Sequence, residues 1–127
     1  MMTEKDYCDY ETCVALKELG YKESCFGHYF KTEFCIDMPP KYYQSDRYVS
    51  APTLYEVQKW MRENHNIHIS TKPYPNEGGL MWMFEIRRFS PYLVSVIVNK
   101  TGFYDSEEAL LEGIKTVVKY IQEGKYE

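Results

Sequence analysis

The sequence predicts one α+β domain that runs helix, β-hairpin, helix, three-stranded antiparallel meander, helix. Its 127 residues, 44% of them hydrophobic, are enough to bury a single core. Apolar side chains recur at helical spacing in three segments, and short stretches rich in aromatic and β-branched residues lie between them. We therefore expect a helix and hairpin at 1–38, a Tyr-rich loop at 39–51 and an α-β-β-β-α unit at 52–123.

The N-terminal part predicts a short helix followed by a hairpin. Residues 9–19 carry apolar side chains at helical spacing, and Gly20 follows where a left-handed cap is favoured. Residues 25–30 and 32–37 are rich in aromatic and β-branched side chains, so we expect two strands that turn near Lys31.

The segment 39–51 has neither strand nor helix periodicity, and a loop of that length in a compact domain is often functional. Tyr42, Tyr43, Arg47 and Tyr48 combine the residue types that are enriched in protein interfaces and recognition loops. They are the candidate binding residues. The alternative is that their rings fold back over the core, and the sequence leaves both readings open.

The C-terminal unit has the clearest signals for where helices and turns begin and end. Pro52 and the capping box Thr53 to Glu56 predict a helix that ends at 64–66. Strands are then expected at 67–71, 80–88 and 92–98. Turns are expected at 72–79, which contains two prolines and two glycines, and at the Ser-Pro pair at 90–91. A last helix begins at Asp105 and carries a continuous apolar stripe, with Gly124 closing it.

The middle strand is apolar on both faces. Leu80, Trp82, Phe84 and Ile86 should point toward the helices, yet the opposite face also carries methionines, Met81 and Met83. We expect the N-terminal part, or a second copy of the protein, to cover that second face.

Composition and charge disfavour several classes. The net charge of −4 gives no general attraction to nucleic acid, and 17% aromatic residues exclude disorder. The sequence shows neither a membrane-length apolar run nor a signal peptide, so we expect a cytoplasmic protein with reduced thiols and no membrane association. The pairs Cys25/His28 and His65/His68 do not repeat a zinc-site spacing, so we expect no metal and no other cofactor.

Catalysis would need a nucleophile beside a base. Cys25 or Cys35 with His28 could supply one, because a hairpin brings cross-strand neighbours together. Cysteines among phenylalanines are more often inert core residues, so a small Cys/His enzyme is the alternative and no catalytic residue is assigned.

The order helix, three strands, helix in 52–123 resembles the double-stranded-RNA-binding domain in topology only. That family places lysines at the start of its last helix to contact phosphates, whereas this chain has the acidic segment Asp-Ser-Glu-Glu at 105–108. Nucleic-acid binding, through that fold or through stacking on the loop tyrosines, is therefore an alternative that the charges oppose.

A second resemblance spans nearly the whole chain. The blocks LKELGYKESCF at 16–26, Ala51-Pro52 with Trp60-Met-Arg62, and YDSEEAL at 104–110 resemble small uncharacterised proteins encoded by phages and mobile elements of gut bacteria. The resemblance implies a shared fold and brings no known activity. We therefore expect a non-catalytic interaction or accessory protein whose partner is another protein or a second copy in a homodimer.

Overall fold

The computed structural model describes residues 3–23, 26–36, 48–91 and 94–124. These residues form three α-helices and two three-stranded antiparallel sheets, which confirms the predicted α+β class. The chain divides into two compact units, Met1–Tyr55 and Glu56–Glu127.

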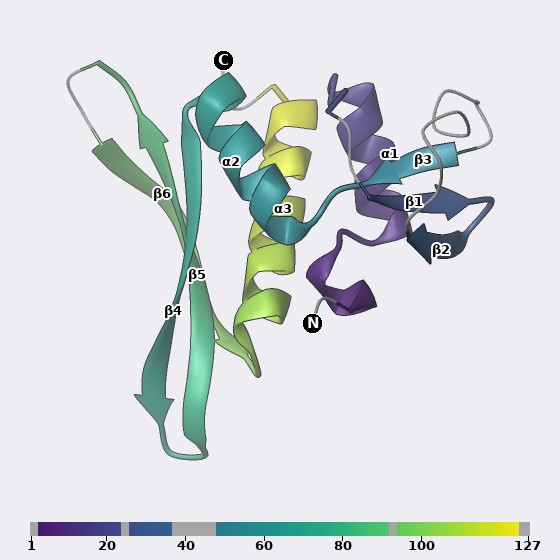
Figure 1. The fold of residues 1–127 in the computed structure, drawn as a ribbon. Helices are drawn as coiled ribbons and strands as arrows, with labels where there is room; N and C mark the ends of the chain where they lie inside the picture. Colours follow the sequence, from purple (N-terminus) through teal and green to yellow (C-terminus); the bar gives the residue numbers. More distant parts are fainter. Residues whose placement is uncertain (1–2, 24–25, 37–47, 92–93, 125–127) are drawn as a thin grey trace. The chain divides into compact units, whose positions relative to one another are not determined.

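The first unit contains a sheet of strand order β2-β1-β3 and one α-helix (Figure 1). Its elements are η1 (Glu4–Asp6), α1 (Tyr10–Glu18), β1 (Gly27–Phe30), β2 (Glu33–Ile36) and β3 (Tyr48–Ala51).

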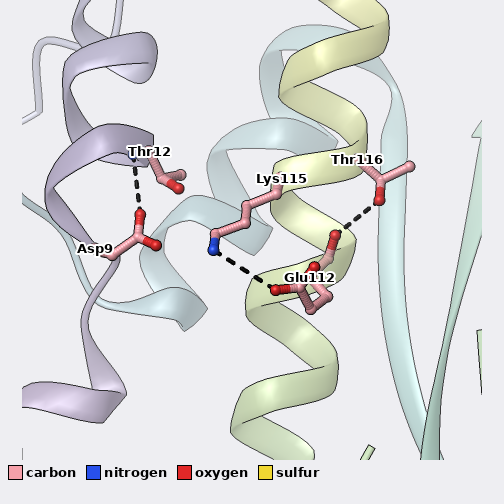
Figure 2. Close-up of polar contacts among 5 residues, drawn as sticks. All are labelled: Asp9, Thr12, Glu112, Lys115 and Thr116. Carbon is pink, nitrogen blue, oxygen red and sulfur yellow. Dashed lines mark hydrogen bonds and ion pairs between the residues drawn. The ribbon is translucent and has the colours of Figure 1, made fainter. Parts of the chain in front are cut away.

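The predicted helix at 9–19 and the glycine signal after it are confirmed. The Asp9 carboxylate accepts a hydrogen bond from the Thr12 N–H at 3.0 Å (Figure 2), and Gly20 follows the helix at φ +98°. The hairpin turn is also where it was expected, with Lys31 at φ 56° between β1 and β2.

The expected loop at 39–51 is wrong at its C-terminal end, because Tyr48–Ala51 forms β3. This strand pairs with β1 along its whole length, from Phe30 opposite Tyr48 to Gly27 opposite Ala51. A short strand without clear periodicity is stabilised here by a partner some twenty residues away in the sequence. The candidate residues Tyr42, Tyr43 and Arg47 lie outside the described residues.

Tyr29 connects the first sheet to the segment that precedes α1. Its hydroxyl donates to the Cys8 carbonyl at 3.0 Å, and its ring meets Tyr10 edge-on with centroids 5.5 Å apart. Burial is the main reason that the Tyr29 pKa is raised well above its ordinary value. The phenol therefore stays protonated and acts as a buried donor.

The second unit comprises most of α2 (Leu54–His65), a sheet of strand order β4-β5-β6 and α3 (Ser106–Gln122). The strands are β4 (Ile67–Asn76), β5 (Gly79–Phe89) and β6 (Val94–Phe103). The predicted order of helix, three antiparallel strands and helix is confirmed.

Two of these strands are longer than the sequence predicts. β4 does not end at residue 71 but continues through both prolines, with Pro73 opposite Trp82 and Pro75 opposite Leu80. β6 continues beyond residue 98 as far as Phe103, which lies opposite Trp82. In both cases the long central strand β5 supplies a pairing partner where local propensity favours a turn.

α3 packs on β4 and β5, and Gly113 sets the distance. A Cβ atom at this position would lie 2.7 Å from Cγ2 of Ile69 and 3.3 Å from Cγ of Phe84. The predicted apolar stripe is buried at Leu110, Ile114, Val117 and Val118. Leu80, which was expected to share this core, is 64% exposed. The β4–β5 hairpin extends past the N-terminal end of α3, so the helix does not cover its tip (Figure 1).

Polar contacts between neighbouring residues support α3. The Asp105 carboxylate accepts from the Glu108 N–H at 2.7 Å and caps the helix. Glu112 pairs with Lys115 at 3.6 Å, and the Thr116 hydroxyl donates to the Glu112 carbonyl at 2.8 Å (Figure 2). In the described parts of the chain, no helix is long and apolar enough to cross a bilayer.

Candidate interaction surface

Of the four candidate residues from the sequence, the structure describes Tyr48 alone. It is half-buried in β3, and its ring lies 5.0 Å from the ring of Phe30 on the neighbouring strand. Tyr48 is therefore held in the sheet as part of a cross-strand aromatic pair.

His28 and Cys35 are cross-strand neighbours, as a Cys/His site would require. His28 is buried, and desolvation is the main cause that lowers its pKa. The Cys35 thiol donates to the Glu33 carbonyl, with sulfur and oxygen 3.8 Å apart. The thiol thus contacts the backbone, and among the described residues it makes no hydrogen bond to His28 of the kind that activates a nucleophile.

The second histidine pair separates into two different environments. The ring centroids of His65 and Trp60 are 5.0 Å apart. His68 lies beside Arg62 instead, and its ring centroid is 6.4 Å from that of Phe89. No group of three or more potential metal ligands occurs among the residues that the structure describes.

The protonation state of His68 follows from its hydrogen bond. Its Nδ1 lies 3.4 Å from Nη1 of Arg62, and a guanidinium can only donate, so Nδ1 must accept. Burial, and then the charges of Arg62 and Arg87, lower the His68 pKa. His68 is accordingly neutral at physiological pH, with its proton on Nε2.

Met81 and Met83 lie on the face of the second sheet that is turned away from α3, because α3 packs on Ile69 and Phe84 of the other face. Both methionines are half-exposed. Glu85 and Arg87 follow on this face and form an ion pair, in which Glu85 is 12% and Arg87 46% exposed. The two charges on this part of the face therefore offset each other.

Three apolar side chains gather at the end of this face, where β5 passes to β6. Phe89 lies opposite Val94, and Val96 lies opposite Arg87 two residues along β5. Their exposed fractions are 36% for Phe89, 58% for Val94 and 52% for Val96. We call these three residues the Phe89 patch.

The sequence analysis did not select the Phe89 patch as a site. Phe89 follows the predicted strand 80–88, and Val94 and Val96 lie within the predicted strand 92–98. The sequence did contain a signal for it. The run from 93 to 98 reads Leu-Val-Ser-Val-Ile-Val, which places apolar side chains on both faces of a strand. An edge strand with one solvated face would instead alternate between apolar and polar residues.

Comparison of the chain with protein-family models, with curated proteins and with solved structures found no match.

Proposed function

We propose that this chain is a non-catalytic protein-interaction protein, an accessory protein of a phage or mobile element, that binds its partner through the Phe89 patch. The observation that carries the proposal is the exposure of Phe89, Val94 and Val96 as neighbours on two paired strands. A single exposed apolar residue is ordinary, whereas contiguous apolar side chains on a rigid surface are typical of interfaces.

The surroundings of the patch also fit a protein partner. The half-exposed Met81 and Met83 lie further along the same face, beyond the Glu85–Arg87 ion pair, which brings no net charge. Protein interfaces have such an apolar centre with a polar rim and few unpaired charges. A phosphate-binding surface would require a basic stripe, and the first turn of α3 instead carries Glu107 and Glu108 after the capping Asp105.

Photo-crosslinking in the native host tests this proposal. A photoreactive benzoylphenylalanine at Val96 should form a covalent adduct with a protein, because this position faces the partner. The control places the same group at Lys119, an exposed residue of α3 outside the patch. Mass spectrometry of the adduct then tells a second copy from another protein.

The expected result is an adduct from position 96 and none from position 119. If folded protein carrying the group at position 96 yields no protein adduct, the proposed function is wrong.

A further inference from the structure

The two outer strands of the second sheet differ in how their free edges are protected. The strand order is β4-β5-β6, so among the described residues each outer strand pairs on one side only. An unprotected edge presents backbone N–H and C=O groups to any other strand, and proteins protect such edges with prolines, charges or covering side chains.

The β4 edge is protected by a side chain and by two prolines. The Gln58 amide of α2 donates to the Ile69 carbonyl at 2.6 Å, which shows that Ile69 directs its backbone groups away from β5. Residues two apart in a strand direct these groups to the same side, so Pro73 and Pro75 lie on that outer side as well. Proline has no N–H to offer there, which makes β4 a poor template for a further strand.

Among the residues that the structure describes, the β6 edge carries neither of these protections. Residues Val94–Val98 contain no proline and no charged side chain, and the first charge along β6 is Lys100. A bulge at Ile97 shifts the register with β5, so the regular part at this end is residues 94–96, opposite 87–89. We call residues 94–96 the β6 edge segment, and all three are exposed.

We propose that the β6 edge segment pairs antiparallel with the same segment of a second copy, with the two-fold axis beside Ser95. The two sheets then join into one six-stranded sheet. This inference rests on the proposed function, because it names the partner of the same surface as a second copy of this chain.

Self-complementarity of the segment favours a second copy over another protein. With Ser95 at the axis, Val94 of each copy lies opposite Val96 of the other, so the pairing adds two apolar cross-strand contacts. The axis of such an edge-to-edge pair is perpendicular to the sheet, which keeps both Phe89 patches on one face and in contact. The segment places no like charges opposite each other, since it has none.

The difference between the two edges also predicts a closed dimer. A sheet with two open edges can add further sheets at both, whereas a sheet with one open edge can pair with only one other. The protected β4 edge therefore limits assembly through the second sheet to two chains.

Sedimentation equilibrium of the full chain at micromolar concentrations tests the inference. The wild type should have twice the 15.2 kDa mass of one chain. Ser95→Lys and Ser95→Glu should each be monomeric, because each places like charges opposite each other at the axis. An equimolar mixture of the two should recover the dimer mass, because the charges are then opposite. Gln122→Lys adds the same charge at the exposed end of α3 and should stay dimeric.

Amide hydrogen exchange supplies a second measurement that needs no variant. Protection of the amides of residues 94–96 should increase with protein concentration, while protection of the Tyr74 and Asn76 amides of β4 should not. A wild type that is monomeric at every concentration, a Ser95→Lys variant that remains a dimer, or a mixture that stays monomeric would overturn the inference.

The two proposals fail in distinguishable ways. A monomeric wild type that still forms an adduct from position 96 with a different protein retains the proposed function and rejects the second copy as partner. Absence of any adduct from position 96 rejects the proposed function itself.

Discussion

Gly113 shows how a single residue sets the distance between a helix and a sheet. Glycine within a helix costs about 1 kcal/mol relative to alanine, so α3 would form more readily without it. The missing side chain allows Ile69 and Phe84 to approach the helix backbone, where a Cβ atom would lie 2.7 Å from Ile69. Close packing on two strands is obtained at the expense of local helix stability.

Gly113→Ala should therefore lower the free energy of unfolding by about 1–3 kcal/mol, the usual cost of overpacking a filled core. Urea denaturation followed by circular dichroism measures the change. Gly78→Ala is the matched control, because a Cβ there meets no atom within 4 Å, and it should change stability little. A Gly113→Ala protein as stable as the wild type would show that α3 can move away from the sheet without penalty.

At the scale of elements, the helices follow from local signals, whereas the full extent of the strands does not. The sequence predicts helices that begin at about Asp9 and at Asp105, and in the structure both residues cap their helices with hydrogen bonds to residues three positions on. β3 and the C-terminal halves of β4 and β6 were missed, because each is held by pairing with a distant strand. The two prolines of β4 are turn signals locally, yet they are compatible with an edge strand.

The cap of α3 provides a prediction at this scale. Asp105→Ala should lower the free energy of unfolding by about 1 kcal/mol, because the Glu108 N–H loses its acceptor. Asp105→Asn keeps a side-chain oxygen in place and should retain most of the stability. Thermal unfolding of the three proteins measures the difference. Equal losses in both variants would mean that the charge of Asp105, rather than its hydrogen bond, stabilises the helix.

For the whole molecule, the three histidines should make the folded protein less stable as the pH falls. Burial lowers the pKa of His28, His65 and His68 below the ordinary value of 6.5. As the pH falls through 6.5, the unfolded chain therefore binds protons before the folded chain does. Their contribution to stability is complete above pH 6.5 and is lost as the pH falls toward the lower folded pKa values.

The urea midpoint should therefore be lower at about pH 5.5 than at about pH 7.5, a range in which histidine is the main side chain to titrate. His68→Gln removes one of these groups, together with the cationic form that Arg62 and Arg87 disfavour. The variant should lose less stability than the wild type between the two pH values. A midpoint that rises on acidification would contradict the direction of all three pKa shifts.

The sequence alone determined the α+β class, the helix boundaries and the antiparallel order of β4, β5 and β6, because caps, turns and apolar periodicity are read over a few neighbouring residues. It selected a Tyr-rich segment as the site, from which Tyr48 proved to be a strand residue paired with Phe30. Only the tertiary structure placed Phe89, Val94 and Val96 side by side and showed that Gln58 protects one sheet edge. Those features depend on which strands pair and in which register, and register is set by contacts between residues far apart in the sequence.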